Sequence, residues 1–311
     1  MYKNDLTKAY SSAVLFTLIV GFSFLGIKIC VPYADTLHVL VHRFNFALLA
    51  LVILAVTKLV KIELKGKPKK GLLITAVLYN TFILFQVMGL YYCTSIEGSI
   101  MFAMVPAMVQ VIAAVFLKEK PTWVQVCFIL LSVSSLIVMV VLGSSEITFN
   151  PLGVVIVLLS SLAMAINNVY TRYIRTQYKP IEISTAIIVF GTVLFNLLFI
   201  GRGLIFGNAQ TYFEPFQHTE FVIAVCYLGV GCILASAQIM AYLQSKLQSA
   251  KAAVFGNVST AISIVAGALI LGEPLYAYHI ICSILIVTGA LGINFAGSKG
   301  GKNEVRISDG K

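Results

Sequence analysis

Arg43 is the residue whose type and position in this sequence most clearly suggest binding chemistry. It falls about seven residues into an apolar run, roughly 10 Å deep at a helical rise of about 1.5 Å per residue. A charge at that depth in a membrane faces a cavity or a partner, because hydrocarbon solvates ions poorly. Since a guanidinium binds a carboxylate through two parallel hydrogen bonds, one interpretation is a substrate anchor. The alternative is a structural role, with Arg43 on helix-end carbonyls or on Glu97.

Three other ionisable residues within the first two predicted spans are candidates for weaker roles. Lys28 lies a few residues before Pro32, and it either contacts substrate or extends its ammonium to the outer membrane surface. His38 and His42 are one helical turn apart and share a face. They are candidates for a proton relay, although such histidines more often only form hydrogen bonds.

Amide side chains recur inside the apolar runs. An amide in hydrocarbon costs free energy unless it is hydrogen-bonded, so these side chains should point inward. Each one either joins two helices or lines a polar path for substrate. The candidates for substrate binding are Asn80, Gln86, Asn167, Asn168, Gln238 and Asn257.

Four residues at or near turns are assigned structural roles in forming helix ends. The pair Glu273-Pro274 predicts a helix start, because proline suits the first turn and an acid suits the positive end of the helix dipole. The four residues are Pro106, Glu119, Glu273 and Pro274.

The sequence shows no catalytic or metal-binding constellation. Its six cysteines are scattered without C-x-x-C spacing, which argues against a metal site or a disulfide framework. There is no H-E-x-x-H motif, nucleophile elbow or Walker-type glycine loop. We therefore expect no enzyme activity, no catalytic residue, no metal and no cofactor.

The composition indicates a membrane protein made of helices. The 311 residues are 59% hydrophobic and 11% charged, whereas soluble proteins carry roughly 25% charged residues. A helix needs about 20 apolar residues to cross a bilayer. We expect ten spans, near 11–31, 36–57, 71–92, 98–117, 121–142, 151–171, 182–201, 220–241, 252–271 and 276–296. The longest external loop, near 202–219, is aromatic, which suits the membrane interface, and a substrate lid is the alternative.

Nearly all of the basic residues fall in loops on one side of the membrane if the chain crosses it ten times. With the amino terminus in the cytoplasm, 19 of the 22 Lys and Arg residues fall in cytoplasmic segments. Only Arg202 falls outside, and Lys28 and Arg43 lie within spans. Because short cytoplasmic loops retain Lys and Arg during insertion, we expect a multi-pass protein of the cytoplasmic membrane with both termini inside. The net charge of +10 suits anionic lipid headgroups, and no nucleic-acid partner is expected.

The two halves of the chain resemble each other at an offset of 154 residues. This offset pairs Ser95 with Ser249 and Glu119 with Glu273 without a gap. Five spans per half is an odd number, so the second copy enters the membrane from the opposite side. Such inverted repeats build a central site and allow alternating access. We expect a first repeat at 1–145, a second at 146–297, and a disordered cytoplasmic tail at 298–311.

The chain resembles the ten-span members of the drug/metabolite transporter superfamily that contain two EamA domains. The resemblance covers about residues 11–296 and is best over two segments. These are Leu90–Glu119, with the Thr94-Ser95 turn and Pro106, and Tyr242–Pro274, ending in Gly272-Glu273-Pro274. Arg43 matches a recurrent arginine of the family. The chain departs from the family at Lys118-Glu119-Lys120, where Gly-Glu is usual, and at Thr260, where the first copy predicts proline.

The resemblance implies that the first four helices of each half surround a central cavity, with the fifth and tenth packed peripherally. We expect a carrier for a small polar metabolite, above all an amino acid or related carboxylate, working in export. One alternative is a nucleotide-sugar or lipid-linked cargo, which would need more cations. Another is a membrane-embedded enzyme or a non-transporting sensor. The expected partners are the substrate and the lipid bilayer, and a homo-oligomer is left open.

Overall fold

The structure is a computed structural model that describes residues 2–63, 66–116, 121–144, 150–174, 176–206, 209–246 and 249–308. The predicted turn residue Glu119 lies outside these residues. The described chain forms helices and connecting turns, with no strand among its elements. The elements are α1 (Tyr2–Gly21), α2 (Ser23–Cys30), α3 (Thr36–Val56), α4 (Lys70–Leu90), α5 (Ser95–Phe102), α6 (Val105–Phe116), α7 (Trp123–Gly143), α8 (Pro151–Ile174), α9 (Pro180–Phe206), η1 (Ala209–Gln217), α10 (Thr219–Cys226), η2 (Tyr227–Ala235), α11 (Ser236–Lys246), α12 (Ser249–Ile270) and α13 (Ala277–Ser308).

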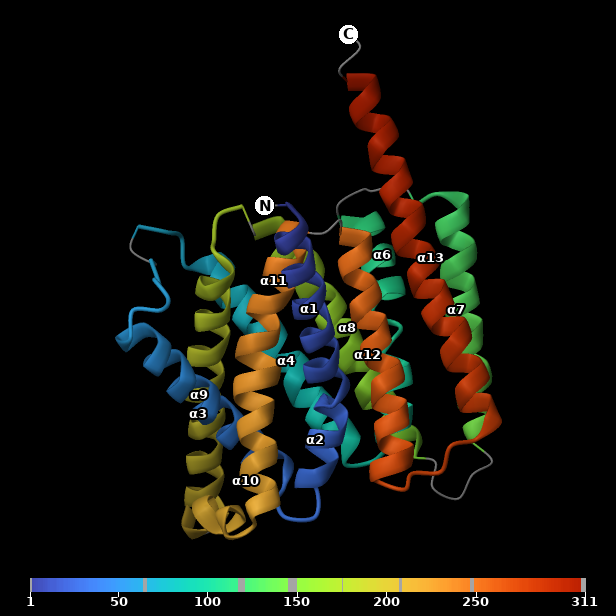
Figure 1. The fold of residues 1–311 in the computed structure, drawn as a ribbon. Helices are drawn as coiled ribbons and strands as arrows, with labels where there is room; N and C mark the ends of the chain where they lie inside the picture. The colour runs from blue at the N-terminus through green and yellow to red at the C-terminus, as the bar shows by residue number, and fades with distance from the viewer. Residues whose placement is uncertain are drawn as a thin grey trace.

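These elements confirm the all-helical, ten-span fold. Within the described residues, nine helical segments are long and apolar enough to cross a membrane. A shorter apolar helix, Phe255–Ile270 within α12, accounts for the remaining predicted span. The helices stand side by side as one bundle, and both termini lie at the same end of it (Figure 1). We call this end the termini end, and the other the opposite end.

Three of the spans are not continuous α-helices. The first span changes from α1 to α2 at Phe22, where the Ser23 hydroxyl donates to the Val20 carbonyl at 2.7 Å. The fourth changes from α5 to α6 just before Pro106, which lies in the first turn of α6, where its missing N–H costs nothing. The eighth contains the π-helical stretch η2, a feature often found at functional sites.

Glycines let the backbones of neighbouring helices approach closely in two places. A Cβ at Gly229 of η2 would collide with the backbone oxygen of Arg43 and lie 3.0 Å from the amide nitrogen of Ala47. Gly289 of α13 likewise faces Ser132 of α7 at close range. Small residues of this kind are the usual means of close helix packing in membranes.

The fifth and tenth helices pack together at one edge of the bundle, as the family resemblance implies. In Figure 1, α7 and α13 lie side by side at that edge, and they are in extensive contact. The backbone of α13 continues as helix to Ser308, where the sequence favoured a disordered segment from residue 298. Figure 1 shows this extension projecting beyond the bundle at the termini end.

The close approach of η2 to α3 gives a test of the packing. We expect Gly229→Ala to destabilise the protein by about 1–3 kcal/mol, because the added methyl group meets backbone atoms that cannot rotate away. Thermal unfolding in detergent should show a melting temperature several degrees below that of the unaltered protein. Gly201→Ala in α9 is the matched control, since nothing lies within 4 Å of a Cβ built there. Equal melting temperatures for the two variants would contradict the packing.

Candidate functional site

The site is built around Arg43, which lies on α3 and is only 2% exposed. The ionisable groups that interact electrostatically with it come from three other elements: Cys30 of α2, Tyr79 of α4 and Cys232 of η2. Two guanidinium nitrogens, Nε and Nη1, have no hydrogen-bond partner. Among the described residues no carboxylate forms an ion pair with Arg43. Arg43 therefore presents free donors and an unbalanced charge at the meeting point of four elements.

The contact with Glu97, one structural role considered for Arg43, is not formed, because Glu97 binds elsewhere. Glu97 instead closes a capping box at the start of α5, accepting from the Thr94 backbone N–H at 2.9 Å. The Glu97 backbone N–H in turn donates to the Thr94 hydroxyl at 3.1 Å. Such reciprocal bonds satisfy helix-end donors that would otherwise lack partners. Glu97 thus acts on its own helix rather than on Arg43.

The ammonium of Lys28 caps the carboxyl end of a neighbouring helix. Its Nζ donates to the carbonyl oxygens of Leu90 and Cys93, both at 3.0 Å. These carbonyls lie at the carboxyl end of α4, where backbone acceptors have no partner within the helix. Lys28 is half-buried and engaged, so this geometry supports a structural role over a substrate contact.

The candidate amides divide into two kinds. Asn80 of α4 donates to the Ile187 carbonyl of α9 at 3.1 Å, and Gln238 of α11 donates to the Ser184 hydroxyl of α9 at 2.9 Å. These two join helices. Asn167 and Asn257 are each only 5% exposed and keep one amide atom, Oδ1 and Nδ2 respectively, without a partner. Asn80 also keeps its Oδ1 without a partner.

The remaining two amide candidates carry less information. Gln86 is buried in α4, and Asn168 is half-buried in α8. One turn beyond Asn167 on α8, the buried hydroxyl of Thr171 also lacks a partner. Unpartnered donors and acceptors inside hydrocarbon are costly, so Asn167, Thr171 and Asn257, together with the Oδ1 atom of Asn80, are the better candidates for lining a polar path.

The two histidines bind η1 rather than each other. His38 Nε2 contacts the Thr211 carbonyl at 3.0 Å, and His42 Nε2 contacts the Tyr212 carbonyl at 2.8 Å. Their ring centroids are 6.5 Å apart. A carbonyl can only accept, so each Nε2 carries a proton. His38 Nδ1 also lies 2.9 Å from a carboxylate oxygen of Asp35.

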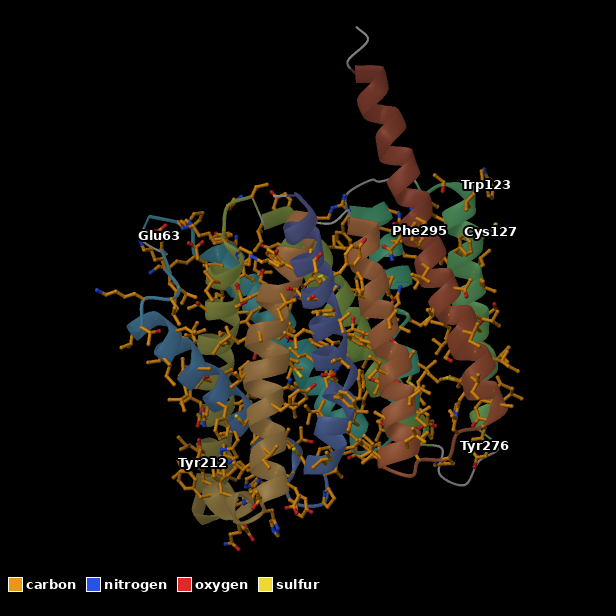
Figure 2. The ribbon with its side chains drawn as sticks, viewed as in Figure 1. Glu63, Trp123, Cys127, Tyr212, Tyr276 and Phe295 are labelled. Carbon is orange, nitrogen blue, oxygen red and sulfur yellow. The ribbon has the colours of Figure 1, made fainter. Side chains whose placement is uncertain are left out.

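The side chain of Tyr212 fixes η1 to α3 and α9. Its hydroxyl accepts from Asn45 at 2.6 Å and donates to Asn196 at 2.7 Å, and Asn196 donates to Asn45 at 2.9 Å. Figure 2 shows Tyr212 near the opposite end of the bundle, far from Glu63. The segment η1, within the predicted external loop, is thus a cap held by polar contacts, and this geometry supports a positioning role for His38 and His42 over a proton relay.

Asp35 ties this cap to the end of α9. Its carboxylate accepts from the backbone and side chain of His38 and pairs with Arg202. Partial burial alone would raise the pKa of Asp35, but the hydrogen bonds from His38 and Arg202 outweigh it and hold that pKa well below its usual range. The Arg202 guanidinium also lies 5.0 Å from the centroid of the Phe199 ring. Arg202, the one basic residue assigned to the external side of the membrane, therefore binds Asp35 and the Phe199 ring there.

Glu182 is a buried acid to which the sequence analysis gave no role. It is fully buried at the start of α9, where it pairs with Lys67 at 2.6 Å and accepts from the Lys179 backbone N–H at 2.9 Å. Lys179 in turn pairs with Glu63 at 2.7 Å. The sequence signal for these Glu182 contacts was an acid in the first helical turn after Pro180. Its lysine partner is over a hundred residues away and could not be found from the sequence.

The prediction that Glu273-Pro274 starts a helix is wrong. The next helix, α13, begins at Ala277, and Pro274 lies in the turn before it. The Glu273 carboxylate instead accepts from the Ser95 backbone N–H at 2.8 Å, the Ser95 hydroxyl at 2.7 Å and the Ile96 backbone N–H at 3.0 Å. Glu273 does bind a helix start, as its residue type suggested, but that helix is α5, in the other half of the chain.

The comparisons with known proteins bear on the whole chain. The model of the EamA-like transporter family matches residues 7–141 and again residues 151–295. The chain belongs to this family. As an EamA family member it is a multi-pass membrane transporter, and its partners are the lipid bilayer and a small-molecule substrate.

Relatives of this EamA chain cover most of its length. It is 35% identical over 296 residues to the uncharacterized transporter YcxC of Bacillus subtilis (strain 168), covering 94% of this chain and 95% of that protein. It is 25% identical over 273 residues to an uncharacterized transporter of Archaeoglobus fulgidus, covering 86% and 92% of the two chains. A protein of known crystal structure shares the fold, with a TM-score of 0.61 at 15% identity, over 92% of this chain and 97% of that one.

The low pKa of Asp35 predicts a pH dependence. A carboxyl group whose pKa is lower in the folded state contributes stability above its unfolded pKa and loses it as the pH falls toward the folded value. We therefore expect Asp35→Asn to unfold at a lower temperature than the unaltered protein at pH 7. The gap should shrink as the pH falls below about 4, the ordinary aspartate pKa. Thermal unfolding in detergent over a pH series measures this.

Glu63→Gln is the control for the Asp35 experiment, because the Glu63–Lys179 pair is exposed and such pairs contribute little. A stability gap for Asp35→Asn that is the same at every pH would show that the ionised carboxylate is not what holds the cap.

Proposed function

We propose that this chain carries small polar metabolites bearing a carboxylate, amino acids or related acids, across the cytoplasmic membrane by alternating access, with export as its direction. In this proposal the substrate carboxylate binds the guanidinium of Arg43. The protein acts as a carrier and not as an enzyme, in keeping with the names of its relatives.

The observation that supports the substrate class is the unbalanced charge of Arg43. Taking an ion out of water costs several kcal/mol, and the cost is offset only by a good partner. Arg43 is 2% exposed, and its Nε and Nη1 have no partner. An anionic substrate that reaches the site would supply the missing charge and acceptors. Carboxylate matches the guanidinium fork through two parallel hydrogen bonds.

The state of Lys28 favours a carboxylate over a cargo rich in phosphate. A nucleotide sugar or a lipid-linked sugar brings two phosphate charges, which would call for several cations. Lys28 is the other basic side chain assigned within a span, and it already donates to two backbone carbonyls. Of the two cations that the sequence assigns within spans, Arg43 is then the one with unpartnered donors, which suits a single negative group.

Alternating access requires two halves that can exchange conformations, and we propose that the halves here are inverted repeats. The two matches to the family model support a duplication, and five helices per half would give opposite orientations. Both termini lie at one end of the bundle, as an even number of spans requires (Figure 1). The excess of Lys and Arg in loops at that end supports its assignment to the cytoplasm.

The proposal for Arg43 gives opposite effects on stability and on binding. In Arg43→Met the unpaired charge is replaced by an apolar side chain of similar length, so we expect unliganded protein to unfold at the same or a higher temperature. Hydrogen bonds to charged groups contribute about 1.5–3 kcal/mol each, so carboxylate affinity should fall by at least roughly tenfold. Saturable uptake of radiolabelled amino acids and other carboxylates into inside-out vesicles measures the second effect.

Lys28→Met is the matched control, since it removes the other cation assigned within a span. Because Lys28 caps α4, this variant should unfold at a lower temperature while carboxylate affinity in the remaining folded protein stays within about twofold. A lower melting temperature for Arg43→Met with unchanged affinity would assign Arg43 a structural role and remove the anchor. Uptake of none of the carboxylates would move the substrate class to the phosphate-bearing cargoes.

A further inference from the structure

Glu273 joins the two halves of the chain at the opposite end of the bundle. Its carboxylate comes from the turn after α12, in the second half, and receives three hydrogen bonds from Ser95 and Ile96 at the start of α5, in the first half. All three donors point at one carboxylate. The N-terminus of a helix also carries a partial positive charge that favours an anion. The contact is therefore strongest when Glu273 is ionised.

The local backbone is shaped for this contact. Gly272 has a φ of 64°, a conformation that disfavours residues with a side chain. The Glu273 backbone N–H then donates to the Gly267 carbonyl at 3.1 Å, which turns the chain back toward α5. Gly267 itself lies against α5, and a Cβ there would lie 2.5 Å from the Ser95 hydroxyl and 2.8 Å from the Glu273 carboxylate. Two glycines thus allow one acid to reach another helix.

The fourth and ninth spans meet at this end. Both segments of the fourth span pack against α8 and α13, but only the outer segment, α5, also packs extensively against α12 among the described residues. The spans therefore approach each other at the opposite end and diverge toward the termini end. A contact confined to one end of two helices can open without separating the helices elsewhere.

Two other charged groups lie near Glu273 and act differently. Glu97 caps the same helix from within it and does not join the halves. Lys28 is held by the carbonyls of Leu90 and Cys93, just before the same turn. Helix α5 thus has one cap from its own half and one from the other, and only the second must break if the halves separate here.

We propose that Glu273 on the N-terminus of α5 is a latch that keeps the opposite end of the bundle closed, and that its release opens the path at that end. This inference rests on the proposed alternating access. The latch is independent of Arg43, because none of its atoms is shared with the carboxylate site.

A buried residue at the contact can report opening. Ile96 is fully buried against Gly267, so a cysteine placed there by Ile96→Cys should be unreactive while the latch is closed. Purified protein in detergent would be treated with a bulky hydrophilic maleimide, and modification at position 96 located by mass spectrometry. Combining the reporter with Glu273→Gln should increase the labelling rate at least tenfold. Gly267→Ala should do the same by steric separation, without altering any charge.

Glu97→Gln in the same reporter background is the matched control, because it weakens a cap on the same helix within one half. Its labelling rate should stay within about twofold of the reporter alone. Equal rates for Glu273→Gln and the reporter alone would overturn the latch. Equally raised rates for Glu97→Gln and Glu273→Gln would overturn it as well, since the cause would be fraying of α5. The labelling needs no substrate, so failure of the carboxylate site would leave this result unaffected.

Discussion

Hydrocarbon offers no hydrogen-bonding partner, and this constraint accounts for most polar contacts inside the bundle. The ends of a helix leave backbone groups without a partner in that helix, and where water cannot reach them a side chain must bind them. Lys28 serves the carbonyls at the end of α4, and Glu97 and Glu273 both serve the amides at the start of α5. Asn80 reaches from α4 to a carbonyl of α9. Under the same constraint, the Nε and Nη1 donors of Arg43 stand out because they have no hydrogen-bond partner.

The breaks also decide where the molecule can change shape. A continuous helix resists bending, whereas a broken one leaves a junction whose partners are few and specific. Here the junctions fall in the first, fourth and eighth spans, and two of the resulting segments, α2 and η2, surround Arg43. Movement at a junction would therefore reach the candidate site directly. The π-helical stretch η2 is closest, since its Gly229 rests on the backbone of Arg43.

Features that depend on solvation could be predicted from the sequence, and features that depend on distant partners could not. Apolar length and charge parity gave ten spans and an even topology because the bilayer acts on each segment separately. Arg43 was identified for the same reason. The carbonyl partners of Lys28, His38 and His42 lie 62 to 173 residues away in sequence, so these contacts appeared only in the fold. Glu273 was recognised as suited to a helix start, but its type and position could not say which helix it would cap.

The pairing of α7 with α13 has a consequence for how the protein is made. Gly289 and Gly292 of α13 fit against Ser132 and Phe128 of α7, yet α7 ends at Gly143 and α13 begins only at Ala277. At a synthesis rate of roughly 5–20 residues per second, α7 waits about 7–27 seconds in the bilayer before its partner emerges from the ribosome. During that interval lipid must cover the face that α13 later occupies. The tenth span thus completes the packing of the fifth, and the first half of the chain reaches its final structure only after α13 has been synthesised.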